Sequence, residues 1–319
     1  MKLRILSADD VRTALPMPAA IAAMRRAFGQ LSAGDATVPL RSRVATEKGV
    51  TLLMPAFLQK SAELGVKIVS VYGENPARGL PVVSATVLVL DPETGFPRAL
   101  MDGSSLTAIR TGAGGGLAAD LLARKDARTV TLFGAGVQAR AQLQAVLAVR
   151  DIQRVNIISR TRQSAQRLAD EISGWENPPR VTLPASVSEA VQNADIIITA
   201  TTSDTPVFDG NDLRPGTHIT GVGSFTPQMQ EVDAVAVSRA RVVVDSREAA
   251  LAEAGDIIIS GAKIAAELGE IVNGTQPGRL DDEEITFFKS VGVAVQDAVA
   301  AAAVLAQAQA RNLGTVVNL

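Results

Sequence analysis

Short runs of apolar and β-branched residues alternate with helical patterns over residues 113–290. Thr129–Phe133 is one such run, an Ala- and Leu-rich helical pattern follows it, and Val155–Ile158 is the next run. Strands that alternate with helices are typical of parallel β-α-β units, so this region predicts a doubly wound parallel α/β sheet of the Rossmann type. Four later runs bring the expected strands to six, the number in a complete dinucleotide domain: Arg180–Leu183, Asp195–Ala200, Thr217–Val222 and Arg241–Asp245.

The first hundred residues follow a different pattern. Apolar positions at helical spacing predict a helix over Pro18–Leu31, and Ser7–Asp10 has the composition of a capped helix start. Turn residues at Asp91–Gly95 predict that Phe96–Met101 runs back antiparallel to the strand before it. That strand and two earlier ones are expected at Thr51–Phe57, Gly65–Tyr72 and Pro81–Leu90. This part is therefore expected to be a mixed antiparallel sheet with one or two helices, an α+β unit.

The length and the last segments complete the expected organisation. A chain of 319 residues exceeds the ~250–300 residues at which single cores stop growing, which predicts two domains. After the six strands, Ile285–Lys289 and Gly292–Gln309 are expected to differ in character, the second being an Ala- and Val-rich helix that packs back on the first domain. The helical pattern Ser104–Arg124 contains four glycines. They indicate either close approach of another backbone or of a cofactor, or a hinge between the domains.

Gly134–Ala139 fits the pattern G-x-G-x-x-G/A at the point where Thr129–Phe133 ends and the helical pattern begins. In such a turn the first glycine permits a sharp bend, the second lets the backbone approach a pyrophosphate, and the small third residue lets helix and strand pack closely. The free N–H groups of the helix start then face the phosphates. A purely structural turn is the alternative, but the strand before it and the helix after it favour a dinucleotide site.

The end of the second strand indicates which dinucleotide binds. An NAD site usually has Asp or Glu there, about 20 residues past the glycines, to bind the ribose hydroxyls. Here the residues are Ser159, Arg160, Thr161 and Arg162. A guanidinium beside hydroxyl groups suits a 2′-phosphate, to which arginine donates paired charge-assisted hydrogen bonds. We therefore expect NADP(H) in preference to NAD(H); the alternative is a solvated basic turn.

Composition excludes several other kinds of site. The net charge is −2, cysteine is absent and His218 is the single histidine. The chain therefore lacks the basic character of a nucleic-acid partner, has no thiol nucleophile, and offers no multi-histidine metal centre. No apolar run approaches the ~18 residues of a membrane span, and the aspartates near the start are unlike a signal peptide. We expect a cytoplasmic protein without membrane, nucleic-acid or metal partners.

A few charged residues are candidates for chemistry. Lys67 lies in an apolar strand pattern, where a buried lysine is costly unless it meets an anion. We expect it to hold a substrate carboxylate or to move a proton. The alternative is an edge-strand lysine that discourages aggregation. Arg41 and Arg110 either bind a carboxylate or phosphate or form surface ion pairs. His218 is expected to be a core histidine, and Asp281–Glu284 a solvated face or helix start.

Five ordered blocks resemble the ornithine cyclodeaminase/mu-crystallin family, and the resemblance covers nearly the whole chain. They are MPAF at Met54–Phe57, LGVKIVSVYGENPARGLP at Leu64–Pro81, DPETGFPRALMDGSSLTAIRTGA at Asp91–Ala113, FGAGVQA at Phe133–Ala139 and FKSVGVAVQD at Phe288–Asp297. The resemblance implies a Rossmann domain at 113–290 and a discontinuous substrate-binding and dimerisation domain at 1–112 and 291–319, pairing in a homodimer. Family members are alanine dehydrogenases, ornithine or lysine cyclodeaminases, opine-type synthases and ketimine reductases.

The same resemblance implies roles for individual residues. Lys67 matches the family's active-site lysine, and Arg41 and Arg110 match its arginines for the substrate carboxylate and the cofactor-proximal site. Ser159–Thr161 is similar to the NADP-binding form of the mu-crystallin branch, and Ser290–Val293 to the segment bordering the nicotinamide. The expected cofactor contacts are Arg110, Thr111, Gly134, Gly136, Val137, Gln138, Ser159, Arg160, Thr161, Thr201, Val222, Ser290, Gly292 and Val293.

One position departs from the family pattern. Cyclodeaminases and alanine dehydrogenases carry an aspartate after the fifth strand, where this chain has Phe225. Oxidising an amine and attacking the imine needs a base for the ammonium proton, whereas reducing a protonated imine does not need that base in the hydride step. We therefore expect an NADPH-dependent reductase of a small cyclic ketimine carboxylate, such as Δ1-pyrroline-2-carboxylate or Δ1-piperideine-2-carboxylate, giving L-proline or L-pipecolate. Two alternatives stay open: an ornithine cyclodeaminase or alanine dehydrogenase with another base, and an NADPH-containing binding protein like mu-crystallin.

Overall fold

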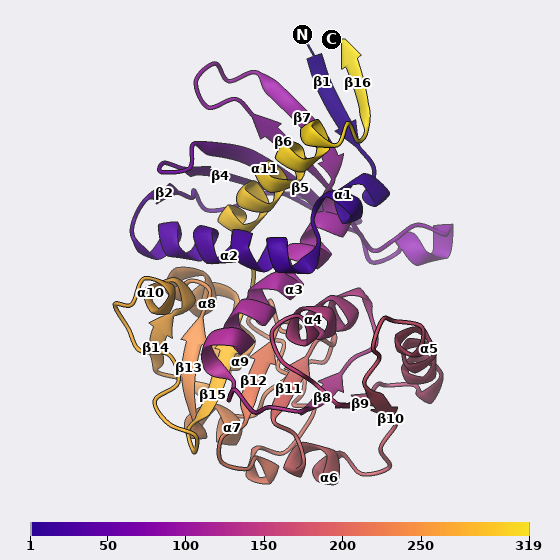
Figure 1. Cartoon of the computed structure of the whole chain (residues 1–319), viewed down its shortest axis with the longest axis vertical. Helices are drawn as coiled ribbons and strands as arrows, with labels where there is room; N and C mark the ends of the chain where they lie inside the picture. Colours follow the sequence, from indigo (N-terminus) through magenta and orange to yellow (C-terminus); the bar gives the residue numbers. More distant parts are fainter. Residues whose placement is uncertain (1, 319) are drawn as a thin grey trace. The chain divides into compact units, whose positions relative to one another are not determined.

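The computed structural model of the chain describes residues 2–318 and consists of two compact units (Figure 1). One unit contains the residues up to Arg110 and those from Val293 onward, and the other is Thr111–Gly292. These boundaries lie within two residues of the expected ones. No helix in the described part of the chain has the length and apolar character that crossing a membrane requires.

The discontinuous unit is built on a mostly antiparallel sheet in the order β16-β1-β7-β6-β5-β4-β2, with β3 paired to β4. β6 and β7 pair antiparallel on either side of the Asp91–Gly95 turn, as predicted. β5 lies between β4 and β6, so the interpretation of Lys67 as an edge-strand lysine is wrong. The strands are β1 Lys2–Leu6, β2 Ala36–Thr37, β3 Ser42–Thr46, β4 Gly49–Leu58, β5 Glu63–Val71, β6 Val83–Leu90, β7 Pro97–Asp102 and β16 Thr315–Asn318.

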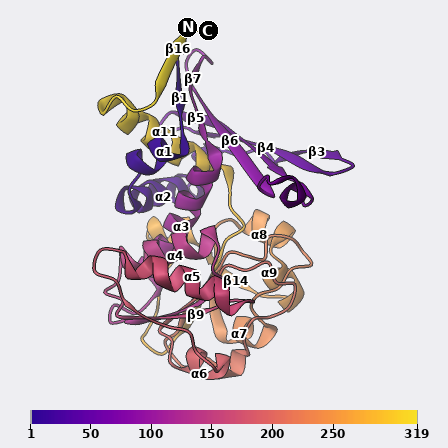
Figure 2. The same cartoon turned by 90° about the vertical axis from the view of Figure 1, so that its right-hand side faces the viewer.

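Helices cover one face of this sheet. α11 packs on β4, β5 and β6 and beside α2, and Figure 2 shows α1, α2 and α11 on the same side. Ser7 caps α1 in a capping box with Asp10, which confirms the predicted helix start. The helices of this unit are α1 Ala8–Ala14, α2 Met17–Ser32, the 3-10 turn η1 Asn75–Arg78, the start of α3 Gly103–Leu122, and α11 Ala294–Ala310.

The second unit has a parallel sheet in the order β10-β9-β8-β11-β12-β15-β13-β14 (Figure 1). Six strands were expected, and that number is wrong. β15 runs between β12 and β13 with all five of its residues buried, and β14 adds an edge. The strands are β8 Thr129–Phe133, β9 Arg154–Ile158, β10 Arg180–Thr182, β11 Ile196–Thr199, β12 His218–Gly221, β13 Ala240–Val244, β14 Ile264–Glu267 and β15 Ile285–Lys289.

The two extra strands were missed for different physical reasons. β15 is separated from its neighbours by long stretches of chain, so its place inside the sheet depends on pairing that sequence proximity does not reveal. β14 is four residues long and contains two alanines and a glutamate, so it lacks the β-branched enrichment of a strand signal.

Apolar side chains form a core on each face of this parallel sheet. Successive residues of β11 point to opposite faces: Ile196 and Ile198 join one core, and Ile197 joins the other. A sheet buried on both faces has continuous apolar strands, which is why these runs were visible in the sequence. The helices of this unit are α4 Val137–Leu147, α5 Arg162–Ser173, α6 Val187–Gln192, the 3-10 turn η2 Gly210–Asp212, α7 Ala234–Arg239, α8 Arg247–Glu253, α9 Gly255–Ser260 and α10 Leu268–Val272.

Three secondary interpretations are resolved within this unit. His218 is fully buried, and its ring nitrogens lie 2.9 Å from the Thr286 hydroxyl and 3.0 Å from the Thr220 hydroxyl, which confirms a core histidine. Glycines in α3 permit close packing on α4, because a Cβ at Gly112 would lie 2.5 Å from the Ala141 carbonyl oxygen. The acidic run Asp281–Glu284 forms an exposed bend and does not begin a helix.

Candidate functional site

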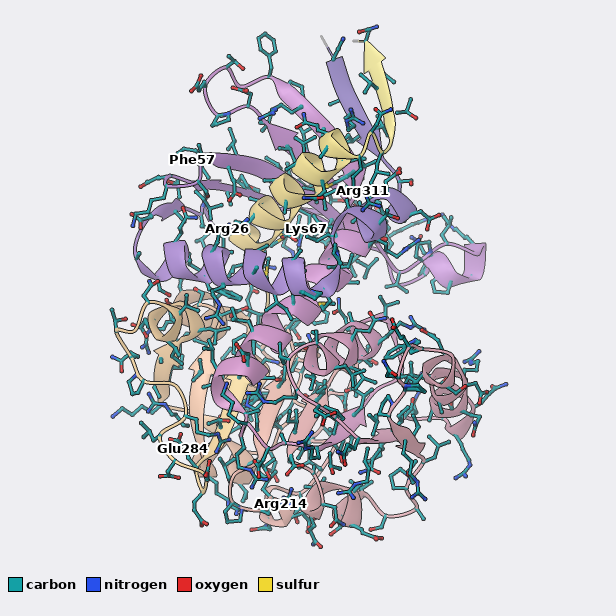
Figure 3. The ribbon with its side chains drawn as sticks, in the orientation of Figure 1. Arg26, Phe57, Lys67, Arg214, Glu284 and Arg311 are labelled. Atoms are coloured by element: carbon teal, nitrogen blue, oxygen red, sulfur yellow. The ribbon has the colours of Figure 1, made fainter. Side chains whose placement is uncertain are left out.

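A buried cluster of charges lies beneath α11 in the discontinuous unit. Lys67 on β5 is 3% exposed, and its Nζ lies 2.7 Å from Oδ2 of Asp297 on α11. Arg110 donates from Nε to the other oxygen of Asp297 at 2.9 Å. One carboxylate therefore pairs with two cations, and Figure 3 labels Lys67 below the ribbon of α11. Arg110 is buried, so its interpretation as a surface ion pair is wrong.

Gln296 fixes the arginine to the start of α11. Its Oε1 accepts from NH1 of Arg110 at 3.1 Å and from the backbone N–H of Val293 at 3.0 Å. The side chain thus both caps the helix and orients the guanidinium. Because Gln296 and Asp297 are adjacent, the first turn of α11 holds two donor groups of Arg110 at once.

Charge in this cluster is unbalanced toward the cations. Burial lowers the pKa of Lys67 to about 8; Asp297 opposes the shift, and the charges of Arg110 and Arg41 add to it. Burial alone would raise the pKa of Asp297, but Arg110 and Lys67 outweigh burial and hold it below its usual value. Arg110 and the half-buried Arg41 thus act on Lys67 through their charges, and Asp297 pairs with both Lys67 and Arg110. This field favours a further anion, such as a substrate carboxylate.

The glycine turn of the parallel unit has the geometry of a phosphate cradle. Gly134 has φ +109°, and a Cβ there would lie 2.4 Å from the carbonyl oxygen of Ala200, so this position requires glycine. A Cβ at Gly136 would meet nothing within 4 Å, which leaves the backbone open to a ligand. Gly136 is the N-cap of α4 and supplies no side-chain cap, so the first N–H groups of the helix remain available to phosphate oxygens. The turn fits a dinucleotide pyrophosphate.

The turn after β9 carries the residues expected to distinguish NADP(H) from NAD(H). Ser159 is half-buried and Arg160 is exposed. Thr161 is the N-cap of α5: its hydroxyl accepts from the Ser164 N–H at 3.2 Å and donates to the Ser164 hydroxyl at 2.8 Å. Thr161 therefore stabilises the helix start, and the guanidinium of Arg160 lies exposed in the same turn.

The other expected cofactor residues of this unit mostly follow strands at the same edge as the glycine turn. Thr201 follows β11, Val222 follows β12, and Ser290 follows β15. Sequence reasoning missed the carboxylate that organises the last of these segments. Oδ2 of the buried Asp245 accepts from the Ser290 hydroxyl at 2.8 Å and from the backbone N–H groups of Val291 and Gly292 at 2.9 and 2.7 Å. Burial raises the pKa of Asp245, and these hydrogen bonds oppose the rise.

Thr111 is the first residue of the parallel unit, and Val293 is the first residue of the second segment of the discontinuous unit. Thr111 is in α3, and its carbonyl oxygen accepts from Nε2 of Gln142 on α4 at 2.9 Å. Val293 is the N-cap residue of α11. Val137 and Gln138 begin α4 directly after the glycine turn.

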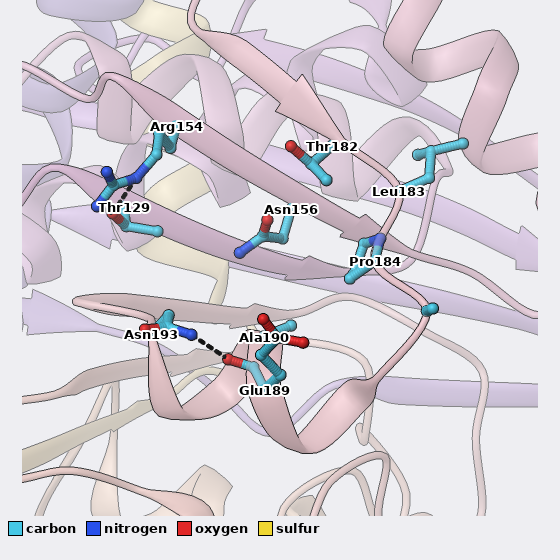
Figure 4. Close-up of a pocket in the computed structure, with 10 residues that line it drawn as sticks. Thr129, Arg154, Asn156, Thr182, Leu183, Pro184, Glu189, Ala190 and Asn193 are labelled. Carbon is cyan, nitrogen blue, oxygen red and sulfur yellow. Dashed lines mark hydrogen bonds between the residues drawn. The ribbon is translucent and has the colours of Figure 1, made fainter.

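A groove of about 540 Å³ lies against β9 and β10, beside α6 (Figure 4). Thr129, which lines it, begins β8, whereas the glycine turn follows the end of that strand. Polar groups of the groove bond within the protein: Arg154 donates to the Thr129 hydroxyl, and Asn193 to the carbonyl oxygen of Glu189. None of the residues that line the groove is an expected cofactor contact. Within residues 2–318, no group of three or more His, Asp or Glu side chains is placed to hold a metal ion.

The sequence of this chain is similar to those of known proteins. The profile of the ornithine cyclodeaminase/mu-crystallin family matches residues 1–312. The chain belongs to this family. Its sequence is 40% identical over 320 residues to a Delta(1)-pyrroline-2-carboxylate reductase of Bacillus cereus, covering 97% of this chain and 98% of the relative.

Solved structures of the family agree in fold over the full length. The Thermococcus litoralis Delta(1)-pyrroline-2-carboxylate reductase in complex with NADH and L-proline has a TM-score of 0.93 at 42% identity, covering 99% of this chain and 100% of that one. An archaeal alanine dehydrogenase dimer with bound NAD also has a TM-score of 0.93, at 34% identity, covering 100% of both chains. These likenesses confirm the predicted fold class, a Rossmann unit with a second α+β unit.

Asp297 is the site residue that the sequence patterns most clearly failed to indicate. It ends the block FKSVGVAVQD, and it is a lone acid in the apolar helix AVQDAVAAAAVLAQAQA. Because a buried charge requires a partner, an acid on an apolar helix was the available signal that a cation lies opposite it. Phe225, the position that departs from the family pattern, is 50% exposed in the segment after β12.

Proposed function

We propose that this protein reduces a small cyclic ketimine carboxylate with NADPH. Suitable substrates are Δ1-pyrroline-2-carboxylate and Δ1-piperideine-2-carboxylate, giving L-proline and L-pipecolate. The observation that carries the proposal is the buried cluster of Lys67, Arg110 and Asp297, whose excess of positive charge suits a carboxylated substrate. The family's reductases of Delta(1)-pyrroline-2-carboxylate, 40% and 42% identical to this chain, support the reaction class. The chain is an oxidoreductase of C–N bonds.

The proposed roles follow from charge and protonation. Arg41 and Lys67 hold the substrate carboxylate, which fixes the imine carbon for reaction. Lys67 has a pKa of about 8, so its ammonium and amine forms are both accessible near neutral pH. It therefore serves as the group that keeps or supplies the imine proton. Asp297 holds the ammonium in place from the opposite side.

The cofactor supplies the hydride that reduces the C=N bond. Gly134 and Gly136, with the first N–H groups of α4, hold the pyrophosphate, and Arg160 binds the 2′-phosphate. The relative's solved complex contains NADH. The preference of this chain for NADPH rests on Arg160 and on the absence of an acidic residue at Ser159–Thr161.

Phe225 supports the direction of the reaction. An apolar ring in place of the dehydrogenases' aspartate removes a base that amine oxidation uses, whereas a protonated imine already carries its proton. The retained Lys67 and its buried partners support an enzyme over a binding protein without catalysis, because burying charges without a function is costly.

A homodimer is the proposed assembly. The sheet face opposite α11 is apolar and uncovered by helices: Ile5 is 41% and Ile68 is 43% exposed, and Leu53 pairs with Ile68 on the same face. Phe57, labelled in Figure 3, shares this face through its position on β4. The archaeal alanine dehydrogenase of the family is described as a dimer.

A substrate screen with both cofactors tests the proposal. Purified protein should oxidise NADPH only when a cyclic imine carboxylate is added. Lack of turnover with both imines, together with ammonia release from ornithine, would replace the reductase with a cyclodeaminase. Lys67→Ala should abolish turnover while leaving NADPH affinity unchanged; turnover that survives would refute the role of the lysine.

The cofactor preference has its own test. Arg160→Ala should weaken NADPH by roughly tenfold or more and leave NADH nearly unchanged, since a hydrogen-bonded ion pair to phosphate is lost only with NADPH. Arg167→Ala is the control, because Arg167 is also an exposed arginine, on the helix that follows the turn. Equal weakening of both cofactors by Arg160→Ala would mean that this guanidinium does not recognise the 2′-phosphate.

A further inference from the structure

The parallel unit contains a buried glutamate that accepts four hydrogen bonds. Glu231 is 0% exposed. Its Oε1 accepts from the backbone N–H of Thr201 at 2.6 Å and from the hydroxyl of the same residue at 2.7 Å. Its Oε2 accepts from the backbone N–H of Gly223 at 2.6 Å and from the Thr199 hydroxyl at 3.0 Å. Every partner is a donor, which is the arrangement that an ionised carboxylate satisfies.

These hydrogen bonds join two neighbouring loops at one edge of the sheet. Thr201 lies just after β11 and Gly223 just after β12, and the two strands pair in parallel. A Cβ at Gly223 would lie 2.4 Å from Oε1 of Glu231, so the glycine permits the carboxylate to reach both loops. Glu231 thus sets the distance between the segments that follow two adjacent strands.

One of these loops packs against the glycine turn. A Cβ at Gly134 would lie 2.4 Å from the carbonyl oxygen of Ala200 and 3.6 Å from Cγ2 of Thr201. The backbone at 200–201 therefore forms the wall next to the first glycine of the motif. A shift of Thr201 away from Glu231 would change the shape of the turn that holds the pyrophosphate.

A second carboxylate fixes Glu231 itself. Oδ1 of the buried Asp256 accepts from the backbone N–H groups of Glu231 and Val232 at 2.7 and 3.0 Å. Nζ of Lys289, fully buried at the end of β15, lies 3.0 Å from Oδ2 of Asp256 and donates to the Ser224 hydroxyl at 2.6 Å. The loop from Gly223 to Glu231 is therefore held at both ends, and the side chain of Glu231 projects from a fixed backbone.

We infer that Glu231 is a positioning residue for the nicotinamide cofactor. It holds Thr201 and Gly223 in register, so that the glycine turn keeps its phosphate-binding shape before the cofactor arrives. The inference rests on the proposed function in requiring a dinucleotide at this edge. Preorganisation of this kind lowers the cost of binding, because loops that are already ordered lose little entropy when the ligand binds.

The variant Glu231→Gln tests this role with little change of shape. The amide nitrogen of glutamine is a donor and would face a donor, so at least one of the two loops must move. Titration of the variant with NADPH, followed by cofactor fluorescence, should show binding weakened by about tenfold, equivalent to about 1.4 kcal/mol. In steady-state assays the KM for the cofactor should rise, while the KM for the imine stays close to that of the unmodified protein.

Asp195→Asn is the matched control. Asp195 is also a buried carboxylate that accepts two backbone N–H groups, those of Arg128 and Thr129, both at 2.9 Å, but at the opposite edge of the same sheet. Its replacement should lower the melting temperature without changing cofactor affinity. Equal losses of affinity in Asp195→Asn and Glu231→Gln would overturn the inference, since the effect would then be general loosening of the unit.

Thr199→Val keeps the inference testable if Glu231→Gln does not fold. It removes one hydroxyl donor to Glu231 and keeps the shape of a strand residue that lies outside the expected cofactor contacts. Cofactor binding should weaken by roughly threefold, which corresponds to the low end of the range for a single intramolecular hydrogen bond. Unchanged affinity in every folded variant would refute the positioning role. If the unmodified protein bound no nicotinamide cofactor, the proposed function itself would fail.

Discussion

Replacing Asp297 with asparagine should move the alkaline limit of activity to lower pH. Asn keeps the shape of the side chain but removes the negative charge 2.7 Å from the ammonium of Lys67. Burial and the charges of Arg110 and Arg41, which all lower the pKa of Lys67, would then act unopposed. Loss of an opposite charge at such a distance changes a pKa by ~1–3 units, so the pKa of Lys67 should fall from about 8 to roughly 5–7.

The direction follows from which form of Lys67 works. If reduction needs the ammonium, activity falls as pH rises through the pKa of Lys67 in the folded enzyme. That loss should centre near pH 8 in the unmodified protein and about 1–3 pH units lower in Asp297→Asn. The measurement is kcat/KM for the cyclic imine between pH 5 and 10. Titration of the free substrate contributes equally to both proteins, so a difference between the two profiles belongs to the enzyme.

Two controls separate this effect from general damage. Breaking one side of a buried ion pair costs ~3–5 kcal/mol, so thermal denaturation must show that the variant is folded at the assay temperature. Asp91→Asn removes an exposed carboxylate of the same unit that does not contact Lys67, and its pH profile should match the unmodified protein. If folded Asp297→Asn kept the unmodified alkaline limit, Asp297 would not control the protonation of Lys67.

Three further predictions follow from single residues. Gly134→Ala should lower the unfolding free energy of the parallel unit by roughly 2–4 kcal/mol in chemical denaturation. The reasons are the positive φ at this position and the added Cβ, which would lie 2.4 Å from the Ala200 carbonyl oxygen. A denaturation curve like that of the unmodified protein would refute this prediction. Ile68→Asp should convert the proposed dimer to monomer in light scattering, and an unchanged mass would remove this face from the interface. His218 has its pKa lowered to about 3 by burial, so its contribution to stability is complete above pH 6.5 and is lost as pH falls toward 3. At pH 4.5 this loss should lower the unfolding free energy of the unmodified protein by about 2–3 kcal/mol. In His218→Asn, the drop in unfolding free energy from pH 7 to pH 4.5 should be smaller by the same amount.

The elements that local sequence predicts are those whose signals lie within a few residues. The cap at Ser7, the turn at Asp91–Gly95 and the helix start after Gly134–Ala139 all depend on backbone preferences of neighbouring residues, and the structure contains each of them. Strands of the parallel sheet were visible because burial on both faces makes them continuously apolar.

Elements and partners decided by pairing at long range were not visible in this way. β15 follows a long stretch of chain after β13, yet it lies between β12 and β13. Glu231 resembled any loop glutamate until the fold placed the donors of Thr201 and Gly223 around it. A polar residue in a loop has the same sequence appearance whether it is solvated or buried, because its burial is set by elements that pack on it.

Lys67 shows the division most clearly. The sequence alone determined that a lysine lies in an apolar strand, which left an edge position and a buried anion site as alternatives. The tertiary structure decided between them by placing β5 inside the sheet and bringing Asp297 and Arg110, 187 residues apart in the chain, to one carboxylate-centred cluster. Backbone preferences are local and are written in neighbouring residues, whereas the free energy of a buried charge depends on the charges that folding brings beside it.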